Sequence, residues 1–154
     1  MILLISENKK RYLPLLLLAD EQEDMIDRYL ERGTLFAEIM DGEPVCVCVV
    51  TREADFCEIK NLATAPAHQK KGHARRMIAH IERNFCTGGE TLTVGTGDSP
   101  LTIPFYEKCG FIRSGVIPNF FTDNYDHEIW EEGVLLRDMI LLSKTVRHEC
   151  VPLC

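Results

Sequence analysis

The sequence contains no apolar run long enough to cross a membrane. Its longest apolar stretches, 15–19 and 45–50, are far shorter than the roughly 20 residues that a transmembrane helix needs. Residues 1–5 lack the basic leader and the cleavage site of a signal peptide, so we interpret them as a strand. Basic residues are also scarce, because 17 Lys and Arg against 24 Asp and Glu leave a net charge of -7. This acidity argues against general binding to nucleic acid or to an anionic membrane.

The motifs of dithiol redox sites and zinc sites are missing too. The chain has seven cysteines but no CxxC pair, and Cys46 and Cys48 share one face of a strand. We therefore expect no metal. Free cysteines in apolar surroundings behave as small hydrophobic side chains and are typical of a reducing cytoplasm. On this basis we expect buried thiols at Cys46, Cys48, Cys57 and Cys109, and surface thiols at Cys150 and Cys154.

What the chain does contain is an alternation of strand and helix signals along nearly its whole length. The predicted strands are 1–5, 35–40, 43–51, 56–64, 91–95, 111–116 and 134–142, and the predicted helices are 9–18, 21–31, 72–84 and 101–109. Asp20 and Glu23 form a capping-box pattern before the second helix, and Asp41-Gly42 predicts a tight hairpin. We interpret 118–133, which is aromatic and acidic without a clean period, as a long loop.

The order of these elements is β-α-α-β-β-β-α-β-α-β-β. It predicts one α/β domain of the α+β type over 1–146, with a mixed sheet of six or seven strands flanked by about four helices. Residues 147–154 form a C-terminal tail. A homodimer is compatible with this arrangement, although nothing in the sequence requires one.

The turn at 69–74, with the sequence QKKGHA, joins a predicted strand to an amphipathic helix. Such a turn binds anions, because the N–H groups of the loop and the helix dipole both favour negative charge. Gly72 has no Cβ and lets a ligand approach the backbone closely. Four basic residues crowd the same turn: Lys70, Lys71, Arg75 and Arg76. A phosphorylated ligand is therefore expected, although no GxxxxGK[ST] run is present and a P-loop is a poor interpretation.

Three segments together resemble the GNAT superfamily of acyl-coenzyme A-dependent N-acetyltransferases. Residues 69–74 match its [Gln/Arg]-x-x-Gly-x-[Gly/Ala] cofactor motif, and 63–66 (ATAP) take the place of its V-x-P segment. Residues 105–111 (FYEKCGF) match its F-Y-x-x-x-G-F motif. The resemblance covers at least 35–111, and it implies a mostly antiparallel sheet and acetyl-CoA as co-substrate.

In that family the fourth and fifth strands separate, and the pantetheine arm of coenzyme A binds the exposed main chain like an added strand. The resemblance therefore implies a set of coenzyme A-binding residues in this chain. They are Leu62, Ala63, Thr64, Gln69, Lys70, Lys71, Gly72, His73, Ala74, Arg75 and Ser99. The alternative for the basic turn is a solvated surface, which would leave the motif at 105–111 unexplained.

Acetyl transfer requires a neutral amine and a proton for the departing thiolate. The resemblance implies Tyr106 as the proton donor, and the alternative for it is a core aromatic. Glu58, eleven residues before Gln69, is the implied general base, with desolvation raising its pKa. Its alternative is an outward-facing strand charge, with water taking the proton instead. His68 and His73 are weaker base candidates.

Acidic residues cluster at 20–24 and 123–132, where the resemblance places the acceptor pocket. They favour a cationic small-molecule amine as acceptor, and the alternative is a role in solubility. Aromatic residues of the same region either line that pocket or pack the loop: Phe120, Phe121, Tyr125 and Trp130. The predicted function is acetyl transfer to a primary amine of a small molecule in a ternary complex. A non-catalytic acyl-CoA sensor and a protein or peptide N-acetyltransferase are the alternatives.

Overall fold

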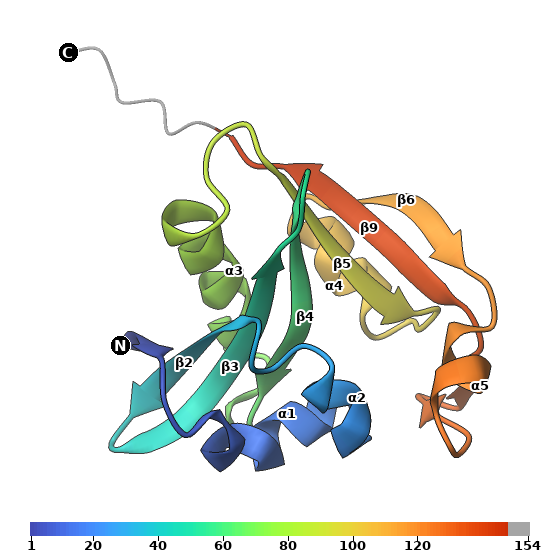
Figure 1. Cartoon of the computed structure of the whole chain (residues 1–154), viewed down its shortest axis with the longest axis horizontal. Helices are drawn as coiled ribbons and strands as arrows, with labels where there is room; N and C mark the ends of the chain where they lie inside the picture. The colour runs from blue at the N-terminus through green and yellow to red at the C-terminus, as the bar shows by residue number, and fades with distance from the viewer. Residues whose placement is uncertain (148–154) are drawn as a thin grey trace.

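The computed structural model describes residues 1–147, and a seven-stranded sheet forms its centre (Figure 1). The strand order is β1-β2-β3-β4-β5-β9-β6. The strands are β1 (Ile2–Ile5), β2 (Thr34–Met40), β3 (Glu43–Arg52), β4 (Cys57–Thr64), β5 (Thr91–Gly97), β6 (Ile112–Ile117) and β9 (Met139–Thr145). Only β4 and β5 run parallel, and the other neighbours are antiparallel. The predicted mixed, mostly antiparallel sheet is confirmed.

Helices cover both faces of this sheet (Figure 1). The helices α1 (Leu13–Ala19) and α2 (Glu23–Asp27) lie on one face, and α3 (His73–Asn84) and α4 (Ile103–Lys108) lie on the other. Each helix buries an apolar stripe against the strands, which is the main source of its stability. No helix within 1–147 is long and apolar enough to cross a membrane.

The hairpin between β2 and β3 follows the prediction from Asp41-Gly42. Asp41 has φ 52° and Gly42 has φ 80°. Two central residues with positive φ are the requirement of the I′ turn, whose twist matches that of the strands it joins. This hairpin holds β3 in the middle of the sheet, where seven of its ten residues are buried.

The N-terminal helices are shorter than predicted. The segment 9–18 begins as a 3-10 turn (Lys9–Tyr12) and continues as α1, with Pro14 in the first turn, where a missing N–H is tolerated. The predicted helix at 21–31 is reduced to α2. The capping box is wrong as well, because Gln22 is the N-cap and no side chain caps the helix. The carboxylate of Asp20 instead accepts hydrogen bonds from two tyrosines, so tertiary partners outcompete the local cap.

The segment predicted as a long loop is partly structured. It contains α5 (Phe120–Asn124) and β7 (Trp130–Glu131), which pairs with β8 (Val134–Leu135). The strand predicted at 134–142 is therefore divided between β8 and β9. Phe121, Ile129 and Leu136 form a small core of their own beneath this segment. The sequence hid these elements because none is longer than five residues, too short to show a period.

The cysteines largely follow the prediction. Cys46, Cys48 and Cys57 are buried free thiols, and Cys109 is partly buried. Cys86, which the sequence analysis did not single out, is buried beside Cys57 and Glu90, with the three side-chain ligand atoms within 4.8 Å of one another. The carboxylate of Glu90 is already paired with Arg52 at 2.5 Å. Cys150 and Cys154 lie outside the described residues.

Candidate active site

The site begins where β4 and β5 separate. The two strands pair only from Cys57 to Ile59, opposite Leu92 to Val94. A β-bulge follows, since Ile59 and Asn61 pair with consecutive residues of β3 and leave Lys60 as the extra residue. Bulges bend a strand and increase its twist. Beyond the bulge, β4 pairs only with β3 within the described chain, so its other edge is free to bind an extended ligand.

A cleft of about 350 Å³ opens between the separated strands. Leu62, Ala63 and Thr64 line it from β4, and Tyr106 lines it from α4. The residues 95–97 of β5 form the opposite wall. The structure therefore brings the predicted main-chain binding residues and the predicted proton donor to one cavity.

The predicted phosphate-binding turn follows directly after this free edge. Gln69 reaches the cleft, and its Nε2 donates to the Thr64 carbonyl oxygen at 3.1 Å. Gly72 has φ 87° and is the N-cap of α3. Since the helix starts at His73, the first N–H groups of α3 have no acceptor within the helix. A left-handed glycine, free N–H groups and the exposed side chains of 70, 71 and 75 fit a pyrophosphate.

The two histidines of this loop do not face the cleft. His73 is only 6% exposed. Its Nδ1 lies 2.5 Å from Glu38 Oε1 and 3.1 Å from Arg76 Nη2. His68 packs edge-on against this ring, with the centroids 5.8 Å apart. The structure therefore does not support the histidines as bases, and it gives His73 the role of anchoring the start of α3.

Tyr106 is both a core residue and a wall of the cleft. It is 7% exposed, and its ring packs edge-on against Phe105 at 5.1 Å and Phe111 at 5.6 Å. Burial is the main cause that raises the pKa of its phenol above the ordinary value. The side chain is therefore a protonated phenol at neutral pH, as a proton donor must be.

Glu58 lies on the opposite face of the sheet from Tyr106. It lines a second hollow of about 470 Å³ on the side of α1 and α2, and its Oε2 lies 2.9 Å from Lys60 Nζ. The two cavities adjoin, because Ile59, Gly95 and Met139 line both. The predicted acid and the predicted base thus line adjoining cavities on opposite faces of the sheet.

Ser99 is a predicted binding residue that lies away from both the cleft and the turn at 69–74. It is buried just after β5 but does not line the cleft. Its Oγ accepts a hydrogen bond from the Leu101 N–H at 3.1 Å, and the Ser99 side chain also hydrogen-bonds to Glu131, which lines the cleft.

A polar network at the junction of the two cavities was missed by the sequence analysis. Asp20 accepts hydrogen bonds from Tyr29 at 2.8 Å and from Tyr125 at 2.5 Å, and it lines both cavities. Burial raises the pKa of Asp20, although these hydrogen bonds act in the opposite direction. Asn61 donates to Tyr29 at 3.1 Å and to the Leu16 carbonyl at 2.9 Å. The sequence signal for this network was Asn61, a polar residue in the middle of a predicted strand.

Asn61 also carries an unsatisfied acceptor. The residue is 3% exposed, and its Oδ1 is buried with no hydrogen-bond partner in the structure. Asn61 lines the cleft between the strands. An unpaired buried acceptor is destabilising, so an N–H group of a bound ligand that donates to Asn61 Oδ1 would be stabilising.

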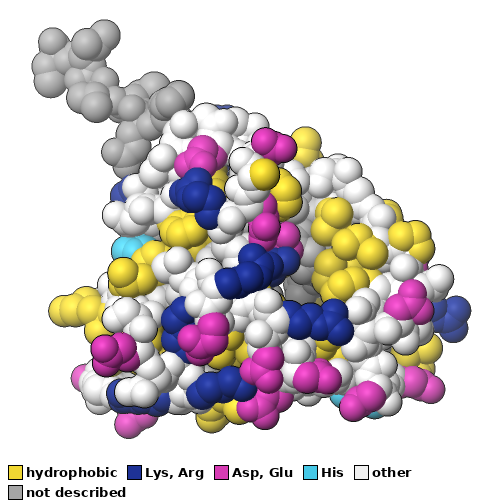
Figure 2. All heavy atoms as spheres, viewed as in Figure 1, with side chains coloured by type: hydrophobic (Ala, Val, Ile, Leu, Met, Phe, Trp, Pro, Cys, Tyr) yellow, Lys and Arg dark blue, Asp and Glu magenta, His cyan; other side chains and the backbone are white. Residues whose placement is uncertain are grey.

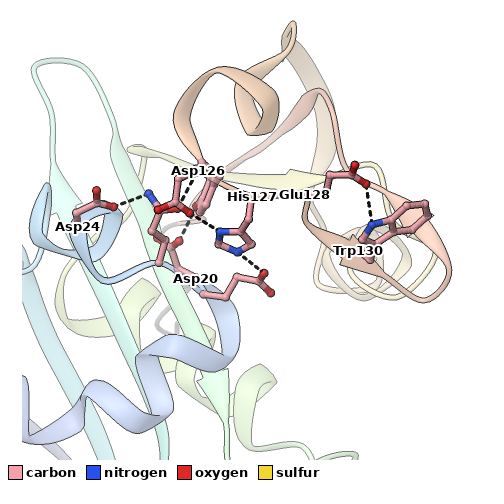
Figure 3. A network of polar contacts seen from close by, with 9 residues as sticks. Asp20, Asp24, Asp126, His127, Glu128 and Trp130 are labelled. Carbon is pink, nitrogen blue, oxygen red and sulfur yellow. Dashed lines mark hydrogen bonds and ion pairs between the residues drawn. The ribbon is translucent and has the colours of Figure 1, made fainter.

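The two acidic regions predicted near the acceptor meet in space, as Figure 3 shows. His127 joins them, with Nε2 2.8 Å from Glu21 Oε1 and Nδ1 2.6 Å from Asp126 Oδ1. Hydrogen bonds to these two carboxylates raise the pKa of His127. The Asp126 N–H also donates to Gln22 at 2.9 Å. Segments about a hundred residues apart in sequence therefore form one acidic rim around the junction.

The aromatic residues of this region pack the segment and also line the cavities, while their place in an acceptor pocket stays a prediction. Phe121 is buried in the small core, with its ring stacked on Tyr125 at 5.6 Å. Phe121, Tyr125 and Trp130 also line the cleft. Trp130 is mostly exposed, and its indole N–H donates to Glu128 at 3.1 Å (Figure 3).

Comparison with known proteins agrees with this architecture. The acetyltransferase (GNAT) domain family matches residues 31–113. The chain is 35% identical over 140 residues to the uncharacterised N-acetyltransferase YvbK of Bacillus subtilis, covering 89% of this chain and 90% of that protein.

Solved structures give the same result. A GNAT family acetyltransferase from Elizabethkingia anophelis with acetyl-CoA bound superposes with a TM-score of 0.86 and 32% identity, covering 94% of this chain and 97% of that one. A Bacillus subtilis acetyltransferase in complex with CoA superposes with a TM-score of 0.83 and 35% identity, over 94% and 97% of the two chains. The chain therefore belongs to the GNAT superfamily and is an acetyl-CoA-dependent N-acetyltransferase.

Proposed function

We propose that this enzyme transfers the acetyl group of acetyl-CoA to a primary amine of a small molecule by direct attack in a ternary complex. The observation that carries the proposal is the gap between β4 and β5. A cleft beside the predicted coenzyme A-binding turn adjoins a separate hollow under α1 and α2 there, because residues of both strands line both cavities. Two substrates can then meet from opposite sides without either having to leave first.

The binding roles follow from the geometry of β4 and of the turn after it. The free edge of β4 at 62–64 binds the pantetheine arm through main-chain hydrogen bonds. The first N–H groups of α3 and the backbone at Gly72 bind the pyrophosphate. Lys70, Lys71 and Arg75 add charge-assisted contacts to the phosphates.

The reaction forms a C–N bond to the acetyl carbonyl carbon and breaks its C–S bond. Acetyl-CoA supplies the activated thioester. Tyr106 donates its phenolic proton to the departing sulfur. Glu58, or a water molecule in the hollow, takes the proton that the amine loses, so charges and atoms balance.

Replacing Glu58 by glutamine tests the base. If the carboxylate takes the proton, kcat/KM near neutral pH falls by about tenfold or more. The affinity for acetyl-CoA stays unchanged, because Glu58 lines the other cavity. Glu43→Gln, an exposed position at the start of β3, is the control. A Glu58→Gln enzyme with the wild-type kcat/KM would assign the proton transfer to water.

An amine panel tests the activity itself. The enzyme is incubated with acetyl-CoA and with small primary amines or peptides, and thiol release and product mass are measured. Acetylated small amines are the expected products. Acetylation of peptides alone would support a peptide N-acetyltransferase. Binding of acetyl-CoA without thiol release for any amine would support a sensor and contradict the proposal.

A further inference from the structure

The hollow under α1 and α2 is lined by both positively and negatively charged side chains, although the rim around it is acidic. We propose that the acceptor carries an anionic group, a carboxylate, in addition to its amine, and that Arg28 binds this group. The inference rests on the proposed acetyl transfer and names the class of acceptor. The proposed acceptor is matched to three features of the site: the charges of the hollow, the polar groups where the two cavities meet, and the apolar part of the wall of the hollow.

Three cations line the hollow, and their partners differ. Lys60 is paired with Glu58 at 2.9 Å, and Arg32 is paired with Glu53 at 3.1 Å. Arg28 forms no ion pair with a carboxylate in the part of the chain that the structure describes. Its Nη1 donates to the neutral amide of Asn124 at 3.0 Å. Arg28 thus offers the hollow a guanidinium whose charge is not neutralised by a pair.

The geometry of a guanidinium suits this role. Its planar fork of N–H donors can form two parallel hydrogen bonds to a carboxylate. The existing hydrogen bond to Asn124 has a neutral acceptor and is therefore weaker than a bond to a carboxylate would be. The charge of Arg28 acts to lower the pKa of Asp20 against the larger effect of burial, and the oxygens of Asp20 accept hydrogen bonds from Tyr29 and Tyr125. Arg28 is exposed and forms no ion pair with these oxygens, so the carboxylate of a ligand can pair with it without displacing a carboxylate of the protein.

The amine end of the acceptor is expected at the junction of the two cavities. Asp20 lines both of them, and its orientation is fixed by two phenols. The unpaired Oδ1 of Asn61 lies at the wall of the cleft, next to this network. Asn61 Oδ1 is the acceptor left without a partner for an amine, and the charge of Asp20 and the acidic rim attract the amine in its ammonium form. The amine then lies between Arg28 and the thioester side of the gap.

The part of the acceptor between its two ends is apolar. The remaining wall of the hollow contains Met25, Phe56, Ile117, Phe120 and Leu141. Figure 2 shows a hollow on this face with Lys and Arg side chains on one side and a hydrophobic patch on the other. An amino acid or an amino carboxylate with an apolar body fits all three regions. A polyamine would bring a second cation to Arg28.

Matched substrate pairs test this inference. Phenylalanine is compared with 2-phenylethylamine, leucine with 3-methylbutylamine, and 6-aminohexanoate with hexylamine, so that each pair differs by the carboxylate. For the wild-type enzyme kcat/KM is expected to favour the carboxylate in at least one pair by about tenfold, or roughly 1.4 kcal/mol. Arg28→Gln removes this preference, because kcat/KM falls more for the carboxylate member of the pair than for the plain amine. Arg113→Gln, an exposed position of β6 outside both cavities, is the control.

A binding measurement separates this inference from the proposed function. N-acetylphenylalanine and its carboxamide are titrated by calorimetry into the protein with coenzyme A present. The carboxylate should bind about tenfold more tightly, and Arg28→Gln should remove the difference. That result without turnover of any amine would overturn the proposed function and keep the anion site. Preference for spermidine or plain amines, or a carboxylate preference that survives Arg28→Gln, would overturn the anion site. Equal binding of the two titrants would also overturn it.

Discussion

Replacing Gly72 by valine is expected to weaken acetyl-CoA binding by roughly a hundredfold or more. This factor corresponds to the free energy of about two charge-assisted hydrogen bonds, which the variant would lose. Gly72 has φ 87°, a conformation that a β-branched residue adopts only under strain. A Cβ at this position would lie 2.9 Å from Arg76 Nη1. It would also stand where the pyrophosphate must approach the first N–H groups of α3. Isothermal titration of acetyl-CoA measures the effect.

The chain offers a matched control for this substitution. Gly42 has φ 80°, and a Cβ there would meet no atom within 4 Å. Gly42→Val therefore introduces the same backbone strain, of about 1–3 kcal/mol, in a hairpin that lines neither cavity. Both variants should lose similar stability in urea unfolding, while only Gly72→Val loses binding. An unaltered affinity of Gly72→Val would mean that acetyl-CoA binds elsewhere.

Tyr106→Phe is expected to lower kcat by about tenfold or more, with little change in the affinity for acetyl-CoA. General acid catalysis typically contributes about a hundredfold or more, and part of this can be replaced by water. Since burial raises the pKa of Tyr106, the wild-type phenol keeps its proton across the neutral range. The phenylalanine ring preserves the edge-on contacts to Phe105 and Phe111, so the core should remain packed.

Steady-state kinetics and calorimetry together separate the two roles of Tyr106. Tyr12→Phe is the control, because Tyr12 is an equally buried tyrosine in the core under α1. It should leave kcat unchanged. If Tyr106→Phe turned over at the wild-type rate, Tyr106 would be a core aromatic alone. A large loss of acetyl-CoA affinity in the same variant would instead indicate a damaged cleft.

Several features of the molecule could be predicted because a few neighbouring residues encode them. Asp41-Gly42 specifies the hairpin through two positive φ angles. Gly72 specifies the left-handed turn before α3 in the same way. The apolar spacing of Met77, Ile78 and Ile81 specifies which face of α3 is buried. In each case the physical cause lies within a short segment.

The residues around the acceptor hollow depend instead on partners that are distant in sequence. Asp20 fits a helix cap locally, yet hydrogen bonds from Tyr29 and Tyr125 hold it at the junction of the cavities. His73 follows a polar loop, yet Glu38 of β2 holds it in the interior. Packing decides which hydrogen-bond donors reach a carboxylate or an imidazole. The hydrogen bonds formed in this way outweigh the small stabilising energy of a local helix cap.

Local conformation and motif spacing were therefore sufficient to predict the family, the order of the elements and the turn that begins α3. The resemblance implied that β4 and β5 separate, but no short segment encodes the residue at which they do so. The separation depends on two contacts of β4: its pairing with β3 continues to Thr64, whereas its pairing with β5 ends at Ile59. The β5 partners of β4 are more than thirty residues away in the chain, so local sequence does not encode where this pairing ends. The same holds for Arg28, whose charge remains unpaired because the carboxylates near it bind other groups.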